Sequence, residues 1–250
     1  MILQKEIDTM ERNERTFSSI WSDPVELDSA TLCVNRNFPD DLLFNRVIEV
    51  HGFDLEKSID RAASYFKTLN EKPTFFITEN QHKLFKALSK KGFRHVDDFN
   101  VMKLAKAVTN EGGTAKIKVV DEKNLASWVE AYMKAFGIAA EFRQEVLKRS
   151  ELSIKDKRCK LYVALVDEKM VGTGLTVSED GVTGFYCIGT LPEFRGRGIA
   201  SQLLQVGIED SKKRGGHLQC LQNLESDKVR AFYEKRGFET VFVKKVYQRV

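Results

Sequence analysis

The chain has 250 residues and a formal net charge of +4, from 40 basic and 36 acidic side chains. This near balance argues against a dedicated nucleic-acid-binding protein, although a local basic patch could still hold an anionic ligand. No run approaches the ~18 apolar residues of a membrane span, and the charged start, residues 1–8, does not resemble a signal peptide. We therefore expect a soluble cytoplasmic protein. The cysteines form no Cys-x-x-Cys pair and have no histidine beside them, which predicts reduced thiols and neither a disulfide nor a metal site: Cys33, Cys159, Cys187 and Cys220.

A polar segment with two glycines, 107–114, interrupts the patterned sequence and predicts a boundary between two domains, 1–108 and 112–250. In the first domain, apolar spacing predicts a helix over 54–69, a strand over 75–78 and a helix over 81–91. The end of this stretch overlays residues 218–238 with a constant offset of 145 residues, which places Gly92 on Gly237. The overlay predicts an internal repeat. The alternative is an unrelated α/β domain that shares one Gly-Phe pair by chance.

The second domain opens with a predicted strand over 116–120. Asp121 is a candidate cap for a helix whose apolar residues recur at helical spacing from Leu125 to Phe136. A second helix is predicted over 141–150. Three strands joined by tight turns then predict an antiparallel meander, over 161–166, 170–177 and 182–188.

The most informative segment is 190–200, which follows the last of these strands and leads into an amphipathic helix. Gly196 and Gly198 at a strand-to-helix turn allow successive backbone N–H groups to point at one spot. A helix N-terminus carries partial positive charge and unpaired donors, so this turn could hold a diphosphate. Arg195 and Arg197 add full positive charge. For a Gly-x-Gly pair alone, a loop that only turns the chain is the alternative.

A second motif, Tyr233-x-x-x-Gly237-Phe238, follows a predicted strand over 218–222 and a helix over 227–236. The order Arg-x-x-Gly-x-Ala, helix, strand, helix, Tyr-x-x-x-Gly-Phe resembles the GNAT N-acetyltransferase superfamily over about residues 114–250. The resemblance implies an α+β fold, with a mixed and mostly antiparallel sheet flanked by helices. Residues 1–108 are then interpreted as a degenerate GNAT-like half, which makes the chain a tandem of two GNAT-like domains.

The resemblance also implies the chemistry of the site. The glycine turn would bind the diphosphate of acetyl-CoA, and the pantetheine arm would lie along 187–190 after this strand separates from the strand over 218–222. The N–H of Ile188 would polarise the thioester carbonyl, and Tyr233 would be the general acid for the departing thiolate. Asn223 and Ser226 stand near positions that are often polar in the family, although Ser226 is also a candidate cap for the helix over 227–236. The implied acetyl-CoA contacts are Cys187, Ile188, Gly189, Thr190, Arg195, Gly196, Arg197, Gly198, Ile199, Ala200, Asn223 and Ser226.

The first domain lacks this chemistry. Leu88 stands at the position of Tyr233, and the acidic segment 51–56 replaces the glycine turn, so we expect no CoA binding there. For the amine proton, Glu141, Glu179 and Tyr186 are candidate bases, with water-mediated deprotonation as the alternative. Cys187 has no histidine partner in the sequence pattern, which favours a structural thiol over a covalent acetyl carrier.

The sequence therefore predicts an acetyl-CoA-dependent N-acetyltransferase that acts on a primary amine of a small molecule, peptide or protein. Tyr132 and Phe136 are expected mainly in the core, with a possible place at the border of the acceptor pocket. Two alternatives remain open. One is a non-catalytic acyl-CoA-binding protein, and the other is an enzyme that uses a longer acyl-CoA.

Overall fold

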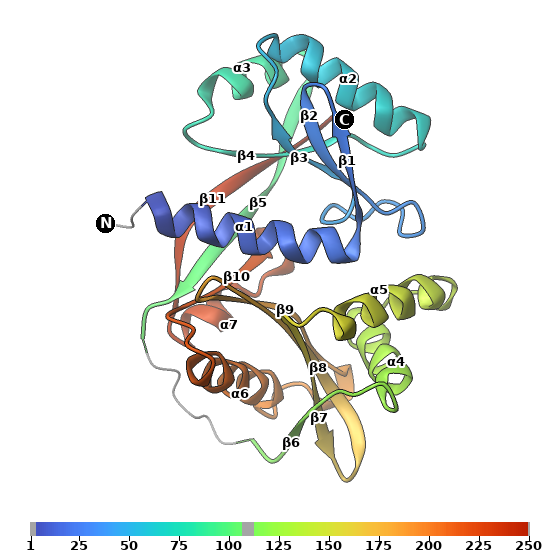
Figure 1. Ribbon diagram of the computed structural model, residues 1–250, viewed down its shortest axis with the longest axis vertical. Helices are drawn as coiled ribbons and strands as arrows, with labels where there is room; N and C mark the ends of the chain where they lie inside the picture. The colour runs from blue at the N-terminus through green and yellow to red at the C-terminus, as the bar shows by residue number, and fades with distance from the viewer. Residues whose placement is uncertain (1–3, 107–112, 250) are drawn as a thin grey trace. The chain divides into compact units, whose positions relative to one another are not determined.

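The computed structural model describes residues 4–106 and 113–249, which group into two compact units (Figure 1). The C-terminal unit comprises Met1–Glu14, Lys103–Leu221 and Phe232–Glu239, and the N-terminal unit comprises Arg15–Met102, Gln222–Ala231 and Thr240–Val250. Each unit thus takes segments from both parts of the sequence. The predicted boundary at 108–112 lies outside the described residues, so the division of the sequence into domains 1–108 and 112–250 stays a prediction.

The C-terminal unit is built on a sheet with the order β10-β9-β8-β7-β6, in which only the β9–β10 pair is parallel. Helix α6 covers one face, and α4 and α5 cover the other (Figure 1). The hairpin turns after β7 and β8 each have two residues with positive φ, the conformation of tight two-residue β-turns. The predicted meander is therefore confirmed. The elements are β6 (Lys116–Val119), α4 (Leu125–Phe136), α5 (Arg143–Lys155), β7 (Cys159–Val166), β8 (Lys169–Glu179), β9 (Val182–Thr190), α6 (Ile199–Lys213) and β10 (Leu218–Leu224).

Some predicted helix ends in these segments are wrong. Asp121 does not cap α4, because its carboxylate accepts the N–H groups of Lys123 and Asn124 and so forms a separate turn before the helix. Helix α5 begins at Arg143, after the short 3₁₀ helix η1 (Ala140–Phe142). The helix expected over 227–236 is only α7 (Arg230–Glu234), because Lys228 has φ +57° and interrupts it. Ser226 is not a cap of this helix and lies within η3 (Glu225–Asp227).

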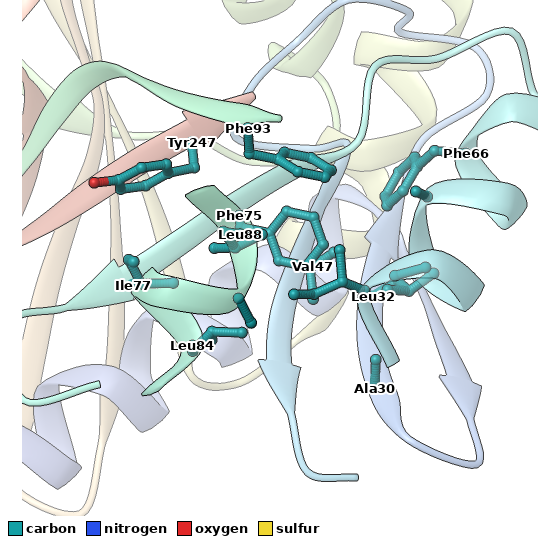
Figure 2. Close-up of a cluster of buried hydrophobic side chains, with 14 of the residues drawn as sticks. Ala30, Leu32, Val47, Phe66, Phe75, Ile77, Leu84, Leu88, Phe93 and Tyr247 are labelled. Carbon is teal, nitrogen blue, oxygen red and sulfur yellow. The ribbon is translucent and has the colours of Figure 1, made fainter. Parts of the chain in front are cut away.

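The N-terminal unit has the strand order β1-β2-β3-β4-β11-β5. Its core joins α2 and α3 to the sheet, and it includes Leu32, Val47, Phe66, Phe75 and Tyr247 (Figure 2). The sequence predicts α2, β4 and α3, and the family order predicts a final strand, which is β11, but the remaining elements of this unit are not predicted. The elements are α1 (Gln4–Trp21), which enters from the C-terminal unit, β1 (Asp23–Leu27), β2 (Ala30–Val34), β3 (Arg46–Val50), α2 (Leu55–Thr68), β4 (Thr74–Thr78), α3 (His82–Lys90), β5 (Phe93–Leu104) and β11 (Phe238–Arg249).

The internal repeat is present in the structure. Strand β11 begins and ends 145 residues after β5, and helix α6 ends 145 residues after α2. Gly92 and Gly237 precede β5 and β11 with φ of +81° and +85°, a conformation that favours glycine. The last strand of the second repeat, β11, pairs with a strand of the first repeat. It is antiparallel to β4, with Gln248 opposite Thr74 and Lys244 opposite Thr78.

None of the helices in the described part of the chain is long and apolar enough to cross a membrane.

Candidate active site

Strand β9 is open along one edge near its C-terminal end. On one side it stays paired with β8 as far as Thr190, which lies opposite Gly172. On the other side its parallel pairing with β10 ends at Phe185, opposite Leu221. Residues 186–190 therefore have no β10 partner, which is the separation of the two strands expected from the sequence. An open strand edge presents backbone N–H and C=O groups to an extended ligand.

A β-bulge lies within this open segment. Thr173 faces Gly189 and Leu175 faces Tyr186, so one residue of β8 is opposite two of β9, Cys187 and Ile188. Cys187 has φ +54°, a strained value for a residue other than glycine. Its carbonyl oxygen accepts a hydrogen bond from the fully buried Thr173 hydroxyl at 3.0 Å.

The Cys187 thiol does not suit a nucleophile. Its burial raises the pKa far above the ordinary value, and the hydrogen bond with Tyr132 offsets only part of that shift. A thiol in this state holds almost no thiolate near neutral pH. The geometry thus agrees with the expectation of a structural cysteine.

Both glycines of the turn have left-handed backbone. After η2 (Pro192–Phe194), Gly196 and Gly198 have φ of +78° and +74°. Gly198 is the N-cap of α6, and no side chain caps the helix. The space beside Gly196 is open, because a Cβ placed there would meet no other atom within 4 Å. The first N–H groups of α6 have no acceptor within the helix, so they can bind an anionic ligand.

The two arginines of the turn have different surroundings. Arg195 donates to the carbonyl oxygens of Ala135 at 3.0 Å and Thr190 at 3.3 Å, which ties the turn to the last turn of α4 and the end of β9. Arg197 is exposed, with its guanidinium 5.0 Å from the centre of the Phe194 ring. Arg195 therefore braces the turn, and Arg197 presents charge to solvent.

Tyr233 lies in α7 and is half-buried, with its ring near those of Phe232 at 5.1 Å and Phe238 at 6.1 Å. The chain turns immediately afterwards at Gly237, where a Cβ would lie 2.6 Å from the Lys106 carbonyl oxygen. Glycine is therefore required at this position by close approach as well as by φ.

Sequence reasoning did not single out Arg236, the residue that links Tyr233 to the glycine turn. Its side chain is 8% exposed, and Nε donates to the Ser201 hydroxyl oxygen in the first turn of α6 at 2.6 Å. Nη1 donates to the Phe232 carbonyl oxygen at 2.7 Å. The sequence signal was the position of this arginine directly before Gly237, but a basic residue at the end of a helix usually has an exposed side chain.

Two predicted site residues belong to the other unit. Asn223 and Ser226 are in the N-terminal unit, whereas the turn, the open end of β9 and Tyr233 are in the C-terminal unit. The buried Asn223 side chain bonds to Asn100 and Met102, both at 3.3 Å. The Ser226 N–H donates to Asp97 Oδ1 at 3.2 Å. Their assignment to the cofactor stays a prediction.

The candidate bases are in three different settings. Tyr186 is buried, and its hydroxyl donates to Asn13 Oδ1 at 2.8 Å. Glu179 is ion-paired with Arg158 at 3.1 Å and precedes the hairpin turn into β9, so it lies at the opposite end of that strand from Thr190. Glu141 is exposed in η1.

Three aromatic residues of α4 contact one another in a row that ends beside the open segment of β9. Trp128 is fully buried and stacks on Tyr132 with ring centres 5.3 Å apart, and Tyr132 meets Phe136 at 4.8 Å. Phe136 is 48% exposed. It also covers Gly189, where a Cβ would lie 2.6 Å from the phenylalanine ring. An aromatic side chain is thus exposed at the edge of the predicted site.

The corresponding place in the N-terminal unit is built differently. Asp54 caps α2, with Oδ1 accepting the Lys57 N–H at 3.1 Å, so a carboxylate sits where α6 has an uncapped N-terminus. An ion pair of 2.6 Å between Lys90 and Glu56 joins α3 to α2. Leu88, at the position of Tyr233, is fully buried. No group of His, Cys, Asp or Glu side chains suited to a metal ion occurs in residues 4–106 or 113–249.

The family model of the GNAT acetyltransferase domain matches residues 157–240. An uncharacterized N-acetyltransferase from Methanocaldococcus jannaschii is 28% identical over 212 residues, which cover 80% of this chain and 91% of the relative. A GCN5-related N-acetyltransferase from Kribbella flavida has a TM-score of 0.69 at 15% identity, covering 96% of this chain and 94% of that structure.

A tandem GNAT protein from the clavulanic acid biosynthesis pathway has a TM-score of 0.63 at 13% identity, covering 81% of this chain and 74% of that structure. These likenesses confirm the predicted α+β fold with two GNAT-like halves. The domain match lies in the C-terminal part of the sequence and includes the glycine turn, α6 and Tyr233. The C-terminal part of the chain therefore carries a GNAT acetyltransferase domain, and the chain is similar to an N-acetyltransferase over most of its length.

Proposed function

We propose that the C-terminal unit transfers the acetyl group of acetyl-CoA directly to a primary amine of a small molecule, peptide or protein, with Tyr233 as the general acid. The observation that carries this proposal is the presence in one unit of an uncapped helix N-terminus behind two glycines, an open strand edge and a tyrosine held to that helix by Arg236. Each feature meets a different need of the reaction.

The glycine turn fits a diphosphate. The positive φ of Gly196 and Gly198 turns backbone N–H groups toward one place, and the open space beside Gly196 lets an anion approach the backbone. Arg197 contributes exposed positive charge. Arg195 supports the same site indirectly, because its hydrogen bonds to Ala135 and Thr190 hold the turn in place.

The open edge of β9 fits the amide groups of a pantetheine arm. Residues 186–190 can pair with such an arm as they would with a neighbouring strand. The N–H of Ile188, within the bulge, is the donor proposed for the thioester carbonyl as negative charge develops on its oxygen. Cys187 takes no covalent part, which its raised pKa supports.

The amine nitrogen attacks the thioester carbonyl carbon, and the C–S bond then breaks. Tyr233 donates its phenolic proton to the departing sulfur, while the amine loses a proton to solvent or a base. With ordinary pKa values of about 10 for tyrosine and 8.5 for a thiol, full transfer is uphill by about 2 kcal/mol. Donation that accompanies C–S cleavage is reasonable, because the developing thiolate gains a hydrogen bond early. Holding donor and amine in line supplies a further part of the rate enhancement.

Thiol release from acetyl-CoA, measured against a panel of small amines, peptides and lysine-containing proteins, tests this function. Amine-dependent release together with the acetylated product is the expected result. Saturable binding of acetyl-CoA with no transfer to any amine would instead support a non-catalytic binding protein. Faster turnover with a longer acyl-CoA than with acetyl-CoA would correct the identity of the donor.

A further inference from the structure

We propose that Thr173 is a positioning residue that fixes the direction of the Ile188 N–H. This inference rests on the proposed function, in which that N–H binds the thioester oxygen. The starting observation is the hydrogen bond of 3.0 Å from the Thr173 hydroxyl to the Cys187 carbonyl oxygen, made at the one bulge in the β8–β9 pairing of the described strands.

The Cys187 carbonyl and the Ile188 N–H belong to the same peptide group. A trans peptide is planar, and its C=O and N–H bonds point in opposite directions. None of the described peptide bonds is cis. Because the carbonyl is held toward Thr173 on β8, the N–H of Ile188 points away from Thr173. On its other side β9 has no β10 partner beyond Phe185, so that N–H is left to a ligand.

The bulge needs an anchor because its backbone is strained. Cys187 has φ +54°, so the peptide that follows it would rotate toward a more ordinary conformation if nothing held its carbonyl. Thr173 is fully buried, so the packing around it keeps its hydroxyl beside that carbonyl. The hydroxyl is therefore the restraint that keeps this peptide in one orientation.

The neighbours of Thr173 are adapted to the same contact. A Cβ on Gly172 would lie 3.0 Å from the Gly189 carbonyl oxygen, and a Cβ on Gly174 would lie 3.0 Å from Ile188 Cδ1. At position 172 a larger residue would crowd the backbone of β9 beside the bulge, whereas at position 174 it would meet only the end of the Ile188 side chain. Only the middle position of Gly172-Thr173-Gly174 carries a side chain, and that side chain makes the hydrogen bond.

The test compares Thr173→Val, which removes the hydroxyl at nearly constant volume, with Thr173→Ser, which keeps it. Thr176→Val is the matched control, because Thr176 is a buried threonine of the same strand whose hydroxyl bonds Tyr162 instead of the bulge. We expect Thr173→Val to lower kcat by roughly 10- to 100-fold, less than or comparable to the loss of an oxyanion donor. The Kd for acetyl-CoA should change by less than about threefold, since the substitution affects only the orientation of the Ile188 N–H. Thr173→Ser should return kcat to near the wild-type value, and Thr176→Val should leave it there.

A second readout does not depend on turnover. In protein labelled with ¹⁵N-isoleucine, titration with acetyl-CoA should shift the Ile188 amide resonance in the wild type and in Thr173→Ser, but much less in Thr173→Val. If Thr173→Val does not fold, Thr173→Ala carries the same comparison. Wild-type kcat and a wild-type Ile188 response in a folded variant without the hydroxyl would overturn the assignment. Absence of transfer by the wild type would instead reject the proposed function, and the amide titration would still decide the role of Thr173.

Discussion

Arg236 donates a hydrogen bond of 2.6 Å to the Ser201 hydroxyl and so joins the end of the tyrosine-bearing α7 to the first turn of α6. The two helices supply the proposed general acid and the proposed diphosphate site. The same arginine lies with its guanidinium carbon 3.6 Å from the centre of the Phe232 ring, beside Tyr233. One buried cation therefore sets the position of two functional groups that are more than thirty residues apart in the sequence.

Replacing Ser201 by alanine should destabilise the protein and also impair catalysis. The variant removes an acceptor of a buried guanidinium, which costs about 1–3 kcal/mol for the donor left behind. We expect a Tm lower by several degrees, with a fall in kcat because α7 is less firmly held. Thermal melting and steady-state kinetics check this, with Gln205→Ala as the control, because the half-buried Gln205 of the same helix bonds Glu209 and not Arg236. A Ser201→Ala protein with an unchanged Tm would show that this hydrogen bond contributes little.

Gly196→Ala and Gly215→Ala form a matched pair for the diphosphate site. The two glycines have φ of +78° and +82°, and a Cβ on either would meet no atom within 4 Å. Both variants should therefore lose a similar ~1 kcal/mol from backbone strain. Only Gly196→Ala places a methyl group where the anion would approach the backbone, so it alone should weaken acetyl-CoA binding in calorimetry, by roughly tenfold or more. Equal affinities in the two variants would place the site elsewhere.

Tyr233→Phe keeps the ring contacts with Phe232 and Phe238 but removes the proton of the proposed general acid. Folding and acetyl-CoA affinity should hardly change, whereas turnover should fall by roughly 10²-fold if chemistry limits the rate. The loss should be smaller for a donor whose leaving thiol has a lower pKa. Single-turnover acetyl transfer at different donor thiols measures both effects.

Tyr186→Phe is the control for this substitution, because the Tyr186 hydroxyl is buried and bonded to Asn13. We expect a loss of stability with turnover largely kept. Full single-turnover activity in Tyr233→Phe would assign the proton to water. A collapse of activity in a folded Tyr186→Phe protein would instead identify that residue as the base.

Phe136→Ala should affect the acceptor more than the donor. The ring is 48% exposed and covers Gly189 beside the open segment of β9, where an acceptor side chain would pack against it. We expect the KM for the best amine to rise by about fivefold or more, with the Kd for acetyl-CoA within about twofold. Phe85→Ala, which removes an aromatic ring that is 44% exposed in the N-terminal unit, should change neither constant. A larger effect on acetyl-CoA than on the amine would assign Phe136 to the donor.

The glycine turn and α6 could be predicted from the sequence because their signals are local. Gly196 and Gly198 mark the turn, and apolar spacing marks the helix. The bulge could not be predicted in this way, because it arises in the pairing of β9 with another strand, β8, which also supplies the Thr173 hydroxyl. Arg236 was missed for the same reason, since its partner Ser201 is 35 residues earlier in the sequence. A hydrogen bond between distant segments leaves no periodic pattern.

Elements that are divided between the two units, such as α1 and β10, show a different limit. Helix α1 has no simple apolar stripe, because its buried face includes Asn13 and Glu14 as well as Met10 and Trp21. Asn223 lies in β10, one residue beyond the predicted strand over 218–222, and both it and its partner Asn100 belong to the N-terminal unit. The family resemblance alone could not show that this end of β10 belongs to the N-terminal unit. The sequence pattern thus fails to predict where polar residues lie when their hydrogen-bond partners are distant in the sequence.

The pairing of β11 with β4 has a consequence for how the protein is made. The sheet of the N-terminal unit combines β4 with a strand from a distant part of the sequence, β11, and its core includes Tyr247 of that strand. Until β11 has been synthesised, the edge of β4 that receives it stays without its partner, a state that is open to mispairing. Removal of β11 would therefore damage a sheet whose strands β1 to β4 are translated long before it.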